Sequence, residues 1–168
     1  MKNVKIQNLG DATRYSFIGT FERLGYKNNI GTLKTSISPI LFLKNIILVD
    51  DNHSLINADD SQLIFKHITL NYGKQFLKLG ELHNGDKLFF KARVCKYTKR
   101  FNPMTTTNYK LERPSKISKL DNSYNGDLPL DKNAVVGYIM NKNRKLYSNK
   151  NDYKDNIYTW AYRKWLKS

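Results

Sequence analysis

The sequence has little of several features that mark large classes of proteins. It contains one cysteine, Cys95, in 168 residues, which excludes an internal disulfide framework. No apolar run approaches the roughly 20 residues of a membrane-spanning helix. The N-terminus also lacks the apolar stretch of a signal peptide. These absences predict a cytoplasmic protein without a membrane segment.

Acidic residues are also few, and the deficit is confined to two segments of the chain. The chain has 14 Asp and Glu against 29 Lys and Arg, which gives a net charge of +15 at pH 7. Residues 87–120 hold ten basic residues and one acid, residues 131–168 hold nine and three, and the rest of the chain is balanced. A uniform lysine-rich composition would raise the charge everywhere. The uneven distribution therefore favours a surface that faces a polyanion, either a nucleic acid or an acidic protein.

The short motifs that carry catalysis or cofactor binding are missing. The sequence has no P-loop, no dinucleotide-binding glycine fingerprint, no nucleophile elbow and no RNA-recognition string of the RNP1 type. Its histidines do not have metal-ligand spacing. Two acidic pairs, Asp50 with Asp51 and Asp59 with Asp60, flank turn residues, where aspartate is common. We therefore expect a non-enzymatic protein with no cofactor and no metal site; a magnesium-dependent nuclease that uses these acids is the alternative.

The residues that are present predict a mainly β fold. Residues 68–80 predict a short helix that ends near Gly80. Five segments rich in branched and aromatic residues predict strands: 14–24, 34–49, 61–66, 87–98 and 109–120. The resulting order, β-β-β-α-β-β, matches a five-stranded OB-like barrel. An SH3-like barrel and an unclassified α+β domain are the alternatives.

A cluster of Asn, Asp, Gly and Pro at 121–135 predicts a boundary between two segments. The OB-like barrel then occupies 14–120, and a C-terminal extension occupies 121–168. Within the extension, 135–140 predicts a strand, and 152–167 predicts a helix with Asp152 as N-cap. This helix either docks on the barrel or binds a partner through its aromatic residues: Tyr158, Trp160, Tyr162 and Trp165.

The strand at 87–98 carries the strongest binding pattern. OB barrels bind single strands by stacking bases on aromatic side chains while cations contact phosphates. Aromatic and basic residues alternate along one predicted face of this strand, continue into the next loop, and are joined by residues of strand one: Phe89, Lys91, Arg93, Tyr97, Lys99, Arg100, Tyr15, Phe17 and Arg23. The alternative is that the aromatic residues cover the outside of the barrel.

Five strings, in their order along the chain, resemble a loosely defined family of small uncharacterised proteins from phages and mobile elements of Gram-positive bacteria. The strings are residues 19–25, 41–46, 76–79, 85–94 and 109–117. The resemblance covers about the first two-thirds of the chain and implies an OB-type barrel, but no reaction. Relatives often carry an Asp-His-Leu-Trp-Phe string in the third strand, whereas residues 60–65 here lack the His and the Trp.

The hypothesis that combines these features is a nucleic-acid-binding protein of a phage or mobile element. Single-stranded DNA is the favoured partner, and RNA is the other nucleic acid that the charge suits. The alternative hypothesis is a protein-binding module that inhibits or recruits a host defence or replication protein.

Overall fold

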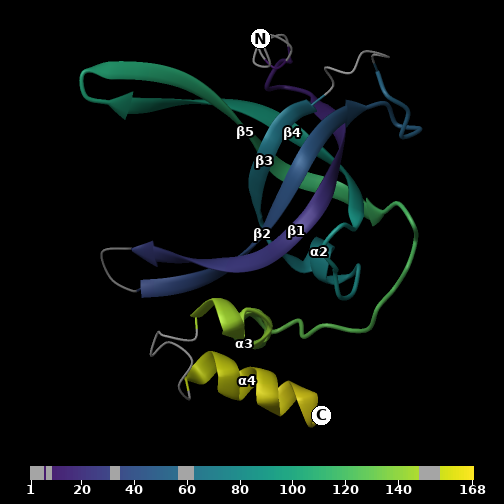
Figure 1. Ribbon diagram of the computed structural model, residues 1–168, viewed down its shortest axis with the longest axis vertical. Helices are drawn as coiled ribbons and strands as arrows, with labels where there is room; N and C mark the ends of the chain where they lie inside the picture. The colour runs from purple at the N-terminus through teal and green to yellow at the C-terminus, as the bar shows by residue number, and fades with distance from the viewer. Residues whose placement is uncertain (1–5, 7–8, 31–34, 57–62, 148–155) are drawn as a thin grey trace. The chain divides into compact units, whose positions relative to one another are not determined.

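The computed structural model describes residues 6, 9–30, 35–56, 63–147 and 156–168 (Figure 1). The chain divides into two compact units. The first unit comprises Met1–Glu22, Leu43–Leu70 and Asn84–Ser123. The second comprises Arg23–Phe42, Asn71–His83 and Tyr124–Ser168.

The predicted mainly β fold with five strands is confirmed. The strands are β1 (Arg14–Ile30), β2 (Thr35–Val49), β3 (Leu63–Asn71), β4 (Lys87–Phe101) and β5 (Met104–Lys119). They form one antiparallel sheet in the order β3-β2-β1-β4-β5, with β3 and β5 as its outer strands. In the part of the chain that the structure describes, these outer strands do not pair with each other. The sheet is therefore open, and the predicted closed barrel is not observed.

The order of helices and strands also differs from the predicted one. Strand β3 continues to Asn71, so the expected helix over 68–80 is reduced to the four-residue α2 (Lys74–Leu77). The predicted strand at 135–140 lies instead in the helix α3 (Lys132–Lys142), which is followed by the 3₁₀ helix η1 (Arg144–Tyr147) and by α4 (Ile157–Leu166). The Asp131 side chain accepts a hydrogen bond from the Ala134 backbone N–H and caps α3.

The core of the first unit follows from alternation along β4. Leu88, Phe90, Ala92 and Val94 are buried, as their spacing predicts. Phe90 is the register partner of Phe17 on β1, and the two rings stack with centroids 5.8 Å apart. On the opposite face of the sheet, Phe89 packs in a smaller buried cluster with Ile18 and Val49. Both faces of this part of the sheet are therefore covered.

In the second unit, α3 is buried along most of its length and packs closely on α4. A Cβ atom on Gly137 of α3 would lie 2.1 Å from the Tyr158 backbone oxygen of α4, so only glycine allows this approach. The α4 helix begins after Asn156, whose side chain accepts hydrogen bonds from the N–H groups of Tyr158 and Thr159. The predicted N-cap, Asp152, lies outside the described residues.

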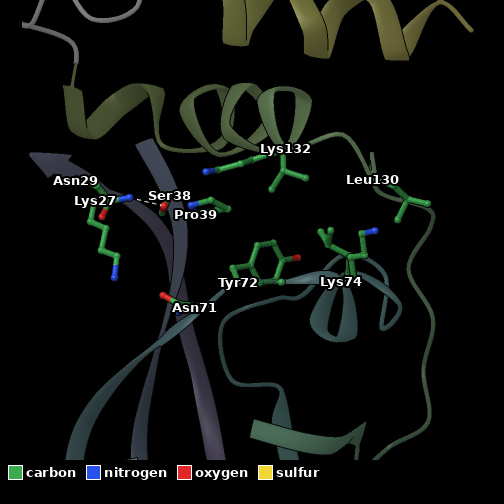
Figure 2. A pocket seen from close by; sticks show the side chains of 12 residues that line it. Lys27, Asn29, Ser38, Pro39, Asn71, Tyr72, Lys74, Leu130 and Lys132 are labelled. Atoms are coloured by element: carbon green, nitrogen blue, oxygen red, sulfur yellow. Dashed lines mark hydrogen bonds between the residues drawn. The ribbon is translucent and has the colours of Figure 1, made fainter. Parts of the chain in front are cut away.

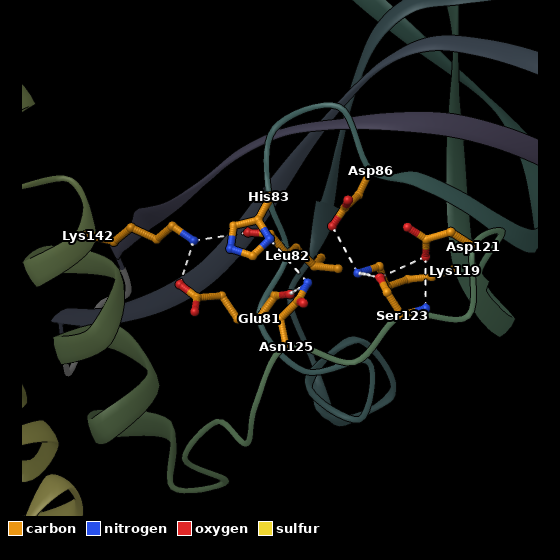
Figure 3. Close-up of polar contacts among 9 residues, drawn as sticks. All are labelled: Glu81, Leu82, His83, Asp86, Lys119, Asp121, Ser123, Asn125 and Lys142. Atoms are coloured by element: carbon orange, nitrogen blue, oxygen red, sulfur yellow. Dashed lines mark hydrogen bonds and ion pairs between the residues drawn. The ribbon is translucent and has the colours of Figure 1, made fainter.

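A polar network ties α3 to the segment before β4 within the same unit (Figure 3). The Lys142 ammonium donates to Glu81 Oε1 at 3.1 Å and to the Leu82 carbonyl at 3.0 Å. The Tyr138 hydroxyl donates to the same carboxylate oxygen. Burial would raise the pKa of Glu81, but the hydrogen bond and charge of Lys142, together with the Tyr138 hydroxyl, outweigh it and hold the pKa below its ordinary value. Glu81 is therefore ionised at neutral pH and anchors α3.

Candidate nucleic-acid interface

The register of β1, β4 and β5 gathers cations on one face of the first unit. Arg93 of β4 lies opposite Arg14 of β1 on one side and opposite Glu112 of β5 on the other. Directly opposed residues of neighbouring strands share a face of the sheet, so the two arginines stand side by side. Neither forms an ion pair among the described residues. The Arg14 guanidinium donates to the Arg113 carbonyl and to the Ser115 hydroxyl, so it is already engaged with β5, and Arg93 is the arginine of the pair that can contact an anion.

Beyond Arg93 the hairpin continues as a two-stranded arm. Pairing of β1 with β4 begins at Arg14 opposite Arg93, whereas β4 and β5 stay paired from there to Phe101 opposite Met104. Residues 94–111 therefore form a ribbon that pairs with no other described strand, seen in green at the upper left of Figure 1. Four cations and no acid lie in this stretch, namely Lys96, Lys99, Arg100 and Lys110, and the Lys110 ammonium lies 2.5 Å from Oε1 of Glu112, the residue that follows the stretch.

Aromatic and apolar side chains lie among these cations. The Tyr97 ring has the Lys99 ammonium 5.9 Å and the Lys110 ammonium 5.8 Å from its centroid. At the tip of the arm, the Phe101 side chain is 62% exposed and Met104 beside it is also exposed. These two side chains give the basic ribbon an apolar tip. We call the following set the basic face: Arg14, Arg93, Tyr97, Lys99, Phe101 and Lys110.

Lys91 continues this face but already has a partner. Its ammonium lies 2.8 Å from Asp51 Oδ1, and the Ser16 hydroxyl donates to the same oxygen at 2.7 Å. These two hydrogen bonds, the one from Lys91 being the stronger, hold the pKa of Asp51 below its ordinary value. Lys91 therefore reaches a phosphate only by leaving Asp51, and Arg93 is the more available cation.

Two of the predicted stacking residues are buried. Phe17 has 0% exposure and belongs to the core, and Phe89 packs in the cluster with Ile18 and Val49. The prediction that strand one shares a face with Lys91 and Arg93 through Tyr15 and Phe17 is wrong, because these residues lie opposite Ala92 and Phe90 on the other face. We therefore leave them out of the basic face.

Two predicted cations also lie elsewhere. Arg23 belongs to the second unit, where its guanidinium stacks on the Phe42 ring at 3.8 Å. Arg100 lies opposite Thr105 on the reverse side of the arm from Lys99. Tyr97, Lys99 and Arg93 remain together on one face, and their role in binding stays a prediction.

The sequence reasoning missed two cations of the basic face, and Phe101 was also not among the predicted residues. Lys110 could have been predicted, because side chains alternate along residues 109–120. This alternation places Lys110 on the same face of the strand as Glu112. Arg14 had no such signal. Its position depends on the register between β1 and β4, which brings together residues 79 positions apart in the chain.

The predicted aromatic residues of the C-terminal helix divide into two groups. Tyr162 contacts the Tyr138 ring of α3 edge-on at 5.8 Å and stacks on Trp165 at 5.9 Å, and Tyr158 is also partly buried. Trp160 is 62% exposed, with the Lys164 ammonium 5.3 Å from its ring centroid. Packing on α3 therefore accounts for three of these residues, and Trp160 remains on the surface.

The residues that suggested catalysis have structural partners. Asp50 accepts hydrogen bonds from the N–H groups of Asn52 and Ser54 and closes a turn, while Asp59 and Asp60 lie outside the described residues. Burial, and then the Glu112 carboxylate that accepts its S–H, raise the pKa of Cys95, which disfavours a thiolate.

The described residues contain no group of three or more His, Cys, Asp or Glu side chains placed to hold a metal ion. They also contain no helix of the length and apolar character that crossing a membrane requires. The chain matches no protein-family model, no curated protein and no solved structure.

Proposed function

We propose that this protein is a non-enzymatic nucleic-acid-binding protein with an OB-like sheet, and that the basic face contacts the strand. The observation that carries the proposal is the β4–β5 arm, whose described surface combines four cations, no acid and an aromatic ring between two lysines. The phosphate backbone supplies most of the attraction in such complexes, through release of counterions. The arm therefore suits a polyanion better than a neutral partner.

The spacing of the basic face supports a single strand. Residues two apart on a strand lie roughly 6.6–6.8 Å apart, so Tyr97 and Lys99 are spaced for neighbouring nucleotides, and Arg93 lies two such steps from Tyr97 on the same face. Stacking of a base on an aromatic side chain contributes about 1–3 kcal/mol, and Tyr97 and Phe101 provide two rings. We favour single-stranded DNA, with RNA as the second nucleic acid. A two-stranded ribbon also fits the major groove of a duplex, so the duplex is the competitor to test.

The first experiment compares the wild-type chain with the double variant Lys99→Ala/Lys110→Ala, which removes two exposed cations of the basic face. Fluorescence anisotropy is measured with labelled oligo-dT, the RNA equivalent and a duplex, across roughly 50 to 200 mM salt. Each lost phosphate contact lowers the slope of log K against log salt by about 0.7 for a single strand. We expect the double variant to bind oligo-dT about tenfold or more weakly at the lower salt, with a slope reduced by about 1.4.

The matched control is Lys66→Ala/Lys87→Ala, which removes the same charge from exposed positions on β3 and at the start of β4. If both double variants weaken binding equally, the arm has no special role and charge alone explains the affinity. If the wild type prefers the duplex, the single-strand proposal is wrong and the arm binds a groove.

The second candidate function is a protein-binding module that inhibits or recruits a host protein. The observation that favours it is the exposed apolar surface of α4, where Ile157, Trp160 and Leu166 are each more than half exposed. The test is a pull-down from nuclease-treated host lysate with the wild type and with Trp160→Ala. A stoichiometric protein that the variant fails to capture supports this function, and equal capture by both chains contradicts it.

A further inference from the structure

A cavity of about 400 Å³ lies within the second unit (Figure 2). It is lined by the far end of β1, the beginning of β2, α2 and the first turn of α3. Its volume falls within the range of sites that hold small organic molecules. The basic face belongs to the other unit and contributes no residue to it.

Three lysines from three different elements line this cavity. Lys27 comes from β1, Lys74 from α2 and Lys132 from α3, and Figure 2 shows them on different sides of Tyr72. No aspartate or glutamate is among the lining residues, and none of the three lysines forms an ion pair with a described residue. All three lysines are exposed, so their ammonium groups give the surroundings of the cavity a positive potential that favours an anion.

The remaining wall of the cavity is largely apolar. Tyr72 is 2% exposed and lies among the lining residues in Figure 2, and Pro39, Leu77 and Val135 also line the cavity. An inorganic ion would leave this wall in contact with water. A ligand that matches the whole cavity therefore has a compact apolar or aromatic body as well as a negative group.

We propose that this cavity binds a small organic phosphate, with the phosphate at the lysines and a ring against Tyr72 and its apolar neighbours. A phosphomonoester carries about −1.5 to −2 charges at pH 7, so it satisfies three lysines better than a carboxylate with one charge. The N–H groups of the lysines supply charge-assisted hydrogen bonds, which are about twice as strong as neutral ones. This site goes beyond the proposed nucleic-acid interface and does not depend on it.

Isothermal titration calorimetry of the full chain at about 200 mM salt tests the proposal with AMP, adenosine and inorganic phosphate. We expect AMP to bind at least about tenfold more tightly than either of the other two, because only AMP contains both the charge and the ring. Lys74→Ala should weaken AMP binding about tenfold. The matched control is Lys78→Ala, an exposed lysine at the end of the same helix that does not line the cavity and should leave the affinity unchanged.

Lys132→Ala repeats the test from α3 in case Lys74→Ala unfolds, and circular dichroism of each variant establishes that it is folded. The double variant Lys99→Ala/Lys110→Ala should bind AMP as the wild type does. Four results each overturn the proposal: no binding of AMP, equal binding of adenosine, equal weakening by Lys74→Ala and Lys78→Ala, or loss of AMP binding in the arm variant. The last of these would place the phosphate on the basic face, so this site can fail while the proposed function stands.

Discussion

At the scale of the residue, the first unit depends on one buried cation. The Lys119 side chain at the end of β5 is 2% exposed, and its ammonium lies 3.2 Å from Asp86 Oδ2. It also donates to the Ser123 hydroxyl at 2.7 Å, and that hydroxyl donates to Asp121 at 2.8 Å (Figure 3). A buried charge without a partner is strongly unfavourable. Asp86 therefore makes the burial of Lys119 tolerable.

Replacing Asp86 by asparagine removes the counter-charge while it keeps the shape of the side chain. We expect Asp86→Asn to lower the free energy of unfolding by about 2–3 kcal/mol, measured by urea denaturation. The matched control, Asp11→Asn, makes the same chemical change at an exposed carboxylate outside this network and should cost less than about 0.5 kcal/mol. Equal effects of the two substitutions would show that Lys119 does not need its ion pair.

At the scale of the element, the α3–α4 pair depends on one glycine. Both tryptophans of the chain, Trp160 and Trp165, lie on α4, so intrinsic tryptophan fluorescence reports on that helix alone. The close approach at Gly137 leaves no space for a methyl group beside the Tyr158 backbone. Any side chain at this position must push α4 away from α3.

Gly137→Ala should therefore destabilise the pair by roughly 1–3 kcal/mol, the usual cost of overpacking. We expect the fluorescence transition of the tryptophans to occur at a lower urea concentration than in the wild type. Gly10→Ala, where nothing lies within 4 Å of an added Cβ, serves as the control and should unfold as the wild type does. An unchanged midpoint in Gly137→Ala would mean that α4 does not pack on α3 as described.

The strands could be predicted because one or both of their faces are buried and the side chains alternate. The alternation of Leu88 to Val94 gave β4 directly. The helix α3 could not be predicted in the same way. Its residues 134–140 are all buried, so the period of a helix with one wet face is absent. The remaining signal for this helix is the N-cap residue Asp131, which lies in a stretch whose composition predicts a loop.

The same distinction applies to the candidate site: some of its members follow from the pattern of a single strand, and others do not. Lys99 and Tyr97 share a face because alternation within one strand decides it. The burial of Phe17 and the position of Arg14 depend on which residues of β1 and β4 lie opposite each other. This register is set by packing across the sheet rather than by neighbours in the chain. The cavity around Tyr72 likewise combines residues from four separate stretches and has no local pattern.

At the scale of the whole molecule, the net charge of +15 opposes folding as well as attracting a polyanion. Like charges repel one another most strongly in the folded state, and dissolved salt screens that repulsion over about 10 Å at 0.1 M. We expect the melting temperature to rise by about 2–4 °C between roughly 20 and 300 mM sodium chloride, which corresponds to about 1 kcal/mol. Sodium bromide at equal ionic strength should give a similar rise. A melting temperature that stays constant or falls in both salts would contradict a dominant role of repulsion.

The division into two units has a consequence for how the chain can be cut and recombined. The backbone passes from one unit to the other five times, and both β1 and β2 begin in one unit and end in the other. Neither unit is therefore encoded by an uninterrupted stretch, and no single junction separates them. A truncated chain that ends before α3 would lack one part of the second unit and retain the other parts. A chimera that replaces one unit would therefore have to exchange three separate stretches of the chain.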